Sequence, residues 1–134
     1  MADLYAAYGS NLQHAQMRQR CPGAEAAGAL LLPGWRLVLR RFARIEPDPD
    51  ASCPVGLWRV APAHLATLDR LEGTPRVYER RRLALPDGGA AWIYIERLDR
   101  PGPPVPGYVE RLRQGYRDFG LDPAPLDAAI ARGG

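Results

Sequence analysis

The chain has 134 residues, of which 46% are hydrophobic and 25% charged, as is ordinary for a globular protein large enough to bury a core. Its net charge of +3 is small, and all 18 basic residues are arginines spread along the sequence, so composition gives no strong case for a nucleic-acid-binding protein. No apolar run approaches the roughly 18 residues of a membrane span, and no basic segment precedes an apolar run at the N-terminus. We therefore expect one domain over residues 1–134, located in the cytoplasm.

Strands and helices are both predicted along the chain. Strands are expected over residues 4–8, 27–32, 35–42, 55–60, 77–85 and 90–95. Helices are expected over residues 11–20, 62–72, 108–119 and 126–131. Pro33-Gly34 predicts a turn or bulge, and residues 86–89 predict the turn of a hairpin. This mixture favours an α+β (mixed α/β) fold with a strongly curved sheet.

Local residue patterns define the ends of the expected helices. Ser10 and Gln13 have capping-box spacing, which predicts a helix beginning near Asn11. Pro62 suits the first position of the second helix, and Gly73 suits its C-terminal stop. Residues 46–52 contain three acids and two prolines, which predicts a loop, either solvated or able to bind a cation.

The cysteines and histidines are too sparse to predict a metal centre. Cys21 and Cys53 lie far apart, so we expect two small buried side chains and no disulfide framework. His14 and His64 have no second ligand at metal spacing, and we expect them at the surface or at helix caps. The sequence therefore predicts no metal centre.

Glu72 is the acidic residue that the helical pattern singles out. The helix 62–72 has one apolar stripe, formed by Leu65, Leu68 and Leu71. At about 100° per residue, Glu72 lies about 40° from the centre of this stripe, in the last turn. Burial and the negative helix end would both raise the pKa of its carboxyl toward the range of a general acid–base. The structural alternative is a glutamate that extends into solvent or pairs with Arg76.

The turn Tyr8-Gly9-Ser10-Asn11-Leu12 is the second feature that indicates chemistry. If a helix begins at Asn11, the N–H groups of residues 9–12 lack helical partners and suit a carboxylate or an oxyanion. Gly9 has no Cβ to block a ligand, and the Ser10 and Asn11 side chains add polar groups. The alternative is an ordinary strand–turn–helix junction with a capping serine.

Together these residues resemble the γ-glutamylcyclotransferase-like family, in particular its small bacterial-type members. Tyr8-Gly9-Ser10-Asn11-Leu12 is similar to the first family signature. Gly56-Leu57-Trp58-Arg59-Val60, followed by Leu68-Asp69-Arg70-Leu71-Glu72-Gly73, is similar to the second, and Tyr78 and Glu79 follow in the expected order. The resemblance runs over residues 4–121. It implies a small mixed α/β fold with a curved, barrel-like sheet flanked by helices.

The resemblance also implies an activity without a cofactor. In such a reaction the α-amino nitrogen of a γ-glutamyl compound attacks its own γ-carbonyl, which releases 5-oxoproline and an amine or amino acid. Glu72 matches the family's catalytic acid/base. Ring closure is favoured by proximity, so the site would mainly hold the folded substrate and move protons. The backbone of residues 9–12 would hold the α-carboxylate or the developing oxyanion.

Tyrosines complete the predicted site. Tyr78, Tyr94 and Tyr108 match positions where members of the family often have pocket tyrosines, although each could equally be a half-buried structural residue. On the strand 77–85, alternation places Tyr78, Arg80 and Arg82 on one face, so one arginine could bind a second carboxylate if that face lines the pocket. The residues that would select the leaving group lie in residues 44–54 and 99–107.

Three functions remain open at this point. The leading one is a cyclotransferase that acts on a small γ-glutamyl compound, with no nucleic-acid or membrane partner, as either a monomer or a homodimer. The second is a non-catalytic module that binds a small γ-glutamyl or other carboxylate ligand. The third is an arginine-rich protein that binds nucleic acid, for which binding would depend on salt.

Overall fold

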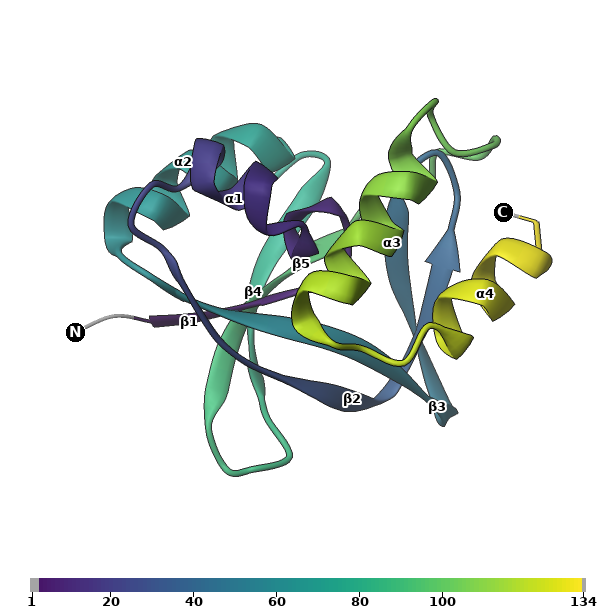
Figure 1. Cartoon of the computed structure of the whole chain (residues 1–134), viewed down its shortest axis with the longest axis horizontal. Coiled ribbons are helices and arrows are strands. Elements are labelled where there is room, and N and C mark those ends of the chain that lie inside the picture. The colour runs from purple at the N-terminus through teal and green to yellow at the C-terminus, as the bar shows by residue number, and fades with distance from the viewer. Residues whose placement is uncertain (1–2, 134) are drawn as a thin grey trace.

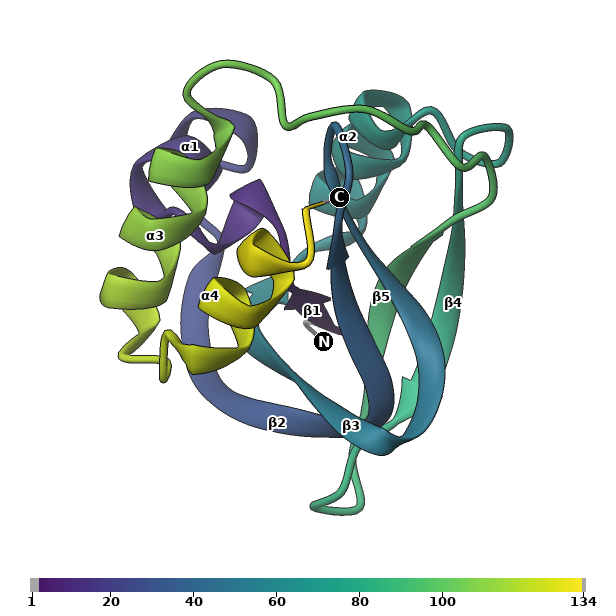
Figure 2. The same cartoon turned by 90° about the vertical axis from the view of Figure 1, so that its right-hand side faces the viewer.

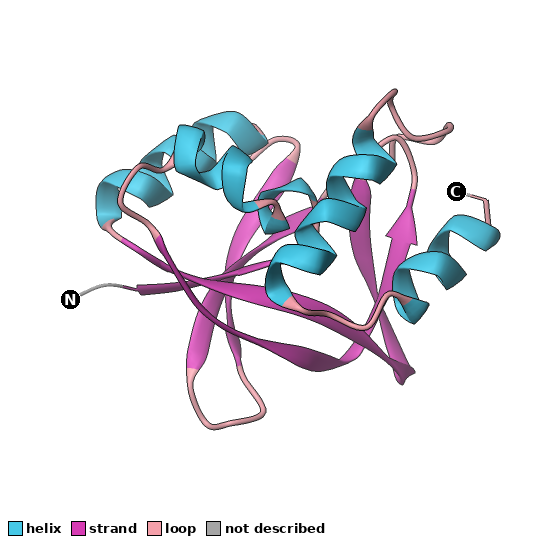
Figure 3. Ribbon diagram, viewed as in Figure 1, coloured by secondary structure: helices cyan, strands magenta, loops and turns pink. Residues whose placement is uncertain are grey.

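Five strands, four α-helices and one short 3₁₀-helix make up residues 3–133, the part of the chain that the computed structural model describes (Figure 1). The strands are β1 (Asp3–Ala7), β2 (Glu25–Leu39), β3 (Ala43–Val60), β4 (Tyr78–Ala84) and β5 (Ala90–Glu96). The helices are η1 (Ser10–Leu12, 3₁₀), α1 (His14–Arg20), α2 (Pro62–Glu72), α3 (Tyr108–Phe119) and α4 (Ala124–Ala131). In the view of Figure 3 the helices lie together along one side, and the strands cross beneath them.

The strands form one mixed sheet in the order β2-β3-β1-β5-β4. Two antiparallel hairpins, β2–β3 and β4–β5, flank β1, which runs antiparallel to β3 and parallel to β5. Figure 2 shows how strongly β2 and β3 curve. The predicted α+β class is confirmed. The sheet remains open, with β2 and β4 at its edges, so the expected barrel-like description fits its curvature and not its closure.

The hairpin of β2 and β3 is longer than the sequence indicated. The predicted loop over residues 46–52 is wrong, because β3 continues through it: Pro47 lies opposite Trp35 and Ser52 opposite Pro33, with residues 48–51 in the register shift between these pairs. Since β1 pairs only with residues 56–60, the other side of β3 is free along this segment, where a proline's missing N–H breaks no ladder bond. The bulge expected at Pro33-Gly34 is present as a register shift.

The first predicted helix is divided into two. Gln13 has extended backbone angles, φ −71° and ψ 119°, and separates η1 from α1. The predicted capping box is also wrong, because Ser10 Oγ accepts a hydrogen bond from Gln16 Nε2 at 2.8 Å and caps no backbone N–H. Gly115 of α3 lies directly against this break. A Cβ there would lie 2.5 Å from the Leu12 Cβ, so α3 packs directly on η1.

The second predicted helix is confirmed as α2, with the expected bounds. It begins at Pro62, and Gly73 ends it in the left-handed region at φ +68°. His64 has the expected capping role, since its Nδ1 accepts a hydrogen bond from the Ala61 N–H at 3.0 Å. The hairpin of β4 and β5 and the helix α3 are confirmed as well, within a residue or so of the predicted ends.

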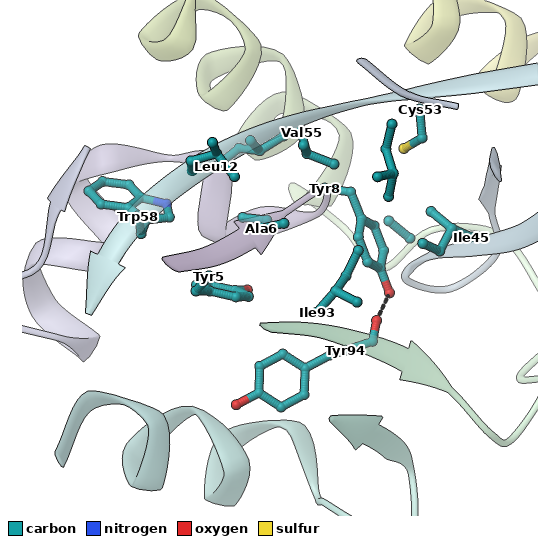
Figure 4. Packing of buried hydrophobic residues seen from close by; sticks show 14 of the residues in the cluster. Tyr5, Ala6, Tyr8, Leu12, Ile45, Cys53, Val55, Trp58, Ile93 and Tyr94 are labelled. Atoms are coloured by element: carbon teal, nitrogen blue, oxygen red, sulfur yellow. Dashed lines mark hydrogen bonds between the residues drawn. The ribbon is translucent and has the colours of Figure 1, made fainter. Parts of the chain in front are cut away.

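The core lies between the sheet and the helices (Figure 4). Tyr5 and Ala6 of β1 are buried, together with Leu12 and Trp58. Cys21 and Cys53 are buried and free, as expected, and burial raises the pKa of the Cys53 thiol to about 12.

His14 has a different place from the one expected. Its ring packs edge-on between the rings of Trp58 and Phe119, with ring centroids 4.9 and 4.6 Å away. It therefore contributes to aromatic packing under α3. None of the helices in residues 3–133 is both long and apolar enough to cross a membrane.

Candidate active site

A cavity of about 300 Å³ opens where the end of β1, the C-terminus of α2 and the connector before α3 meet. In Figure 2 this connector crosses the top of the molecule from β5 to α3. The cavity walls combine apolar, phenolic and charged groups. Among the lining residues are Tyr8, Gly9, Ser10, Asn11, Arg20, Phe42, Ala43, Arg70, Glu72, Tyr78, Tyr94, Arg100, Val105, Tyr108 and Arg111.

Glu72 enters this cavity from the last turn of α2. Leu65 and Leu68 anchor the helix in the core, whereas Leu71 is 49% exposed, so the apolar stripe ends before the last turn. The Glu72 side chain is half-buried at the cavity wall. Among residues 3–133, no hydrogen bond or ion pair engages its carboxylate, and Arg76 does not pair with it.

Burial raises the pKa of Glu72 to about 7, from a usual value of 4.5. The nearby charges act in both directions: Arg20 and Arg100 lower the pKa, and Glu96 raises it. An unpaired carboxyl that titrates near neutrality exchanges a proton easily at physiological pH. This is the property that a general acid–base needs.

The backbone of the turn after β1 forms another part of the cavity wall. Gly9, Ser10 and Asn11 all line the cavity, and among the described residues none of their N–H groups donates to a backbone carbonyl. Leu12 does not line this cavity, since its side chain is fully buried against α3 and its N–H donates to the Gly9 carbonyl at 3.0 Å. The cavity therefore gives no support for a ligand contact at Leu12.

All four tyrosines of the predicted site line the cavity, and the hydroxyl of each bonds to another part of the protein. Tyr8 donates to the Tyr94 carbonyl at 2.6 Å (Figure 4), and Tyr94 donates to Asp69 at 2.7 Å. Tyr108 and Tyr78 hold one residue of the β2–β3 hairpin, described next. Burial raises the pKa of every one of these phenols, so they remain neutral near pH 7.

The first residue of β3 is held at the cavity by two of these tyrosines. The Ala43 N–H donates to the Tyr108 hydroxyl at 3.0 Å, and the Ala43 carbonyl accepts from the Tyr78 hydroxyl at 3.3 Å. The Phe42 ring packs edge-on against Tyr108. The tip of the long hairpin thus becomes part of the cavity wall, which sequence reasoning did not indicate.

The cavity arginines were also missed. Arg80 and Arg82 were the candidates, but they lie outside the cavity, where Arg80 pairs with Asp69 at 2.8 Å and both guanidinium groups stack on Trp92. The arginines at the cavity are instead Arg20, Arg70, Arg100 and Arg111. They come from three helices and a connector, and no spacing in the sequence connects them.

Arg100 is the most firmly held of these arginines. Its Nη2 donates to the buried Glu96 carboxylate at 2.7 Å and to the Tyr78 hydroxyl at 3.2 Å, and its guanidinium lies 4.7 Å from the centre of the Phe42 ring. Arg44 reaches the same carboxylate at 3.4 Å. Because Glu96 is shared by two arginines, its charge is compensated beside the cavity.

Comparison with protein-family models gives a match that covers the whole cavity. The family model described as gamma-glutamyl cyclotransferase, AIG2-like, matches residues 5–111, which include every part of the cavity. The chain belongs to this family. No curated protein sequence shows significant similarity to the chain.

Solved structures share the fold of this family member. One named gamma-glutamyl cyclotransferase matches with a TM-score of 0.82 and 22% identity, covering 98% of this chain and 88% of that chain. The human protein loc79017 matches with a TM-score of 0.82 and 23% identity, covering 97% and 87%. YkqA from Bacillus subtilis matches with a TM-score of 0.78 and 17% identity, covering 98% of this chain and 54% of its own. At these identities the likeness establishes the fold alone.

Proposed function

We propose that the protein is a γ-glutamyl cyclotransferase that converts a small γ-glutamyl compound to 5-oxoproline, with Glu72 as the general acid–base. The observation that carries this proposal is the Glu72 carboxyl, unpaired at a cavity wall with a pKa of about 7. Membership of the family supports the reaction class. The cavity volume of about 300 Å³ suits a ligand of dipeptide size.

In this proposal Glu72 moves protons between two nitrogen atoms. It takes a proton from the α-ammonium, and the freed amine attacks the γ-carbonyl carbon to form the lactam C–N bond. As the original amide C–N bond breaks, Glu72 delivers a proton to the leaving nitrogen. The nucleophilic nitrogen loses two protons overall and the leaving nitrogen gains two, so the reaction needs no other co-reactant.

The other walls of the cavity would bind and orient the substrate. The N–H groups of Gly9 and Asn11, and that of Ser10, which also contacts the Tyr108 hydroxyl, would donate to the α-carboxylate or to the oxyanion that develops on the γ-carbonyl. The neutral tyrosines provide a rigid boundary that favours the folded conformation needed for ring closure.

The test is release of 5-oxoproline, measured by mass spectrometry. Wild-type protein, Glu72→Gln and Glu79→Gln are incubated with γ-glutamyl dipeptides, γ-glutamylamines and glutathione. Glu79 is the matched control because it is a half-exposed glutamate that pairs with Arg81 outside the cavity. We expect the Glu72 variant to lose about 10²-fold or more of the activity, and the Glu79 variant to retain it.

Two results would contradict the proposal. Wild-type turnover by Glu72→Gln would remove the catalytic role of this residue. Tight binding of γ-glutamyl ligands in calorimetry, without product from any of them, would instead favour the non-catalytic binding module.

A further inference from the structure

Asn11 lies in the cavity wall, yet its side chain is committed to other protein groups. It is 3% exposed. Its Oδ1 accepts hydrogen bonds from Arg20 Nη1 at 2.9 Å and from Gln16 Nε2 at 3.0 Å, and its Nδ2 donates to the Tyr5 hydroxyl at 3.0 Å. These bonds occupy both ends of the amide, so the side chain has little capacity left for a ligand.

Arg20 is the group that Asn11 holds at the cavity. It stands in the last turn of α1 and lines the same cavity as Glu72. No nitrogen of Arg20 comes within 4.0 Å of a carboxylate oxygen of Glu72. In the described residues its hydrogen-bond partner is the neutral amide of Asn11, so its positive charge remains uncompensated by any direct acidic contact.

We propose that Asn11 is a positioning residue that holds the Arg20 guanidinium near Glu72 but out of a direct ion pair. Glu72 is then stabilised by a positive charge through space, while its two oxygens stay open to a ligand. A direct ion pair would occupy those oxygens and hold the group as a carboxylate. The effect of these open oxygens on turnover rests on the proposed function. The arrangement of charges around Glu72 does not depend on it.

Other charged and titratable groups line the cavity or act on Glu72 from the surrounding elements. They are Arg100 and Glu96 near the end of β5, Arg70 on α2 itself, Arg111 and Tyr108 on α3, Tyr5 on β1, Tyr8 directly after it, Tyr78 on β4 and Tyr94 on β5. The tyrosines are neutral near pH 7, and Arg100 is compensated by its bond to Glu96. Arg20 has no such compensation. Of the two arginines, Arg20 lowers the Glu72 pKa more.

The test is an NMR titration of the Glu72 side-chain carboxyl carbon, assigned by its loss in Glu72→Gln. In Arg20→Gln the Glu72 pKa should rise by about 1 unit, because an opposite charge is removed. In Asn11→Ala it should fall by a similar amount, because the released Arg20 can pair directly with Glu72. Arg18→Gln is the matched control, since Arg18 is an exposed arginine of the same helix outside the cavity, and it should leave the pKa unchanged.

Opposite shifts in the two variants distinguish positioning from a general loss of structure. An unchanged pKa in Arg20→Gln, or an upward shift in Asn11→Ala, would overturn the inference. If Asn11→Ala does not fold, Asn11→Ser takes its place under the same criterion, because its shorter side chain cannot reach Arg20. The titration needs no turnover. A protein that gives both shifts but no 5-oxoproline would refute the proposed function and leave this inference standing.

Discussion

At the scale of single residues, Glu72 combines a feature visible in the sequence with one that is not. The helical pattern placed it beside the apolar stripe of α2, and burial is indeed the largest cause of its raised pKa. The sequence could not indicate that Arg20 and Arg100 act against burial, because these residues come from segments far from α2 along the chain. Local periodicity predicts which face of a helix is buried, but not which charges meet that face.

The raised pKa of Glu72 has a consequence for stability. Because the folded protein binds this proton more tightly than the unfolded chain, Glu72 lowers the free energy of unfolding as pH rises from about 4.5 to about 7. After a discount for solvent screening, we expect Glu72→Gln to be more stable than wild type by about 1–2 kcal/mol at pH 8 and equally stable below pH 4.5. Chemical denaturation across this pH range measures the difference.

Glu79→Gln is again the control, since its carboxyl is half-exposed. Relative to wild type, Glu79→Gln should show no comparable gain in the free energy of unfolding between pH 4.5 and 8. A Glu72→Gln variant that loses stability at pH 8 would mean that the carboxylate makes favourable contacts, which is contrary to its unpaired position.

At the scale of elements, strong local signals were predicted correctly. Pro62 and Gly73 delimit α2 as expected, and the turn of residues 86–89 joins β4 to β5. The failures occurred where tertiary contacts override local patterns. Residues 46–52 look like a loop, but pairing with β2 on both sides of residues 48–51 keeps the segment within β3 as a register shift. Ser10 and Gln13 look like a capping box, but Gln13 is extended and η1, packed closely under α3, is a separate turn.

This close approach gives a test of how η1 is held. A Cβ on Gly115 would lie 2.5 Å from the Leu12 Cβ and 2.9 Å from the Gln13 backbone nitrogen, so α3 or η1 must move. We expect Gly115→Ala to lower the free energy of unfolding by about 1–3 kcal/mol and to raise KM, because Ser10 and Asn11 of the same turn line the cavity.

Equilibrium denaturation and steady-state kinetics measure these two effects. Glu110→Ala, at an exposed position of the same helix, should alter neither. An unaltered KM in a destabilised Gly115→Ala variant would separate the packing of α3 from the geometry of the cavity.

At the scale of the whole molecule, the cavity joins segments that the sequence keeps far apart. Glu72, the turn after β1 and the tyrosines were predicted members, and the structure places them together apart from Leu12. Ala43 and the four arginines were not predicted, because their positions follow from the curvature of the β2–β3 hairpin and from the course of the connector. Short motifs reveal the parts of a site that are contiguous in the chain, and folding supplies the rest.

The arginines allow a prediction about partners. Several are paired with acids across the surface, among them Arg36 with Glu46, Arg80 with Asp69 and Arg113 with Asp127. These pairs offset part of the positive charge, and the net charge of the chain is only +3, so we expect no gel shift with DNA or RNA, even at low salt. A shift that weakens steeply with added salt would revive the nucleic-acid-binding hypothesis.

The measurement that tests the central claim most directly is the pH dependence of kcat/KM for release of 5-oxoproline. Glu72 must be deprotonated to accept the first proton, so kcat/KM should fall about tenfold per pH unit below about pH 7 and level off above it. The residual activity of Glu72→Gln should lack this acidic limb, that is, the fall of kcat/KM below about pH 7. A limb retained in that variant, or a wild-type profile that is flat between pH 5 and 8, would contradict the assignment of Glu72 as the acid–base.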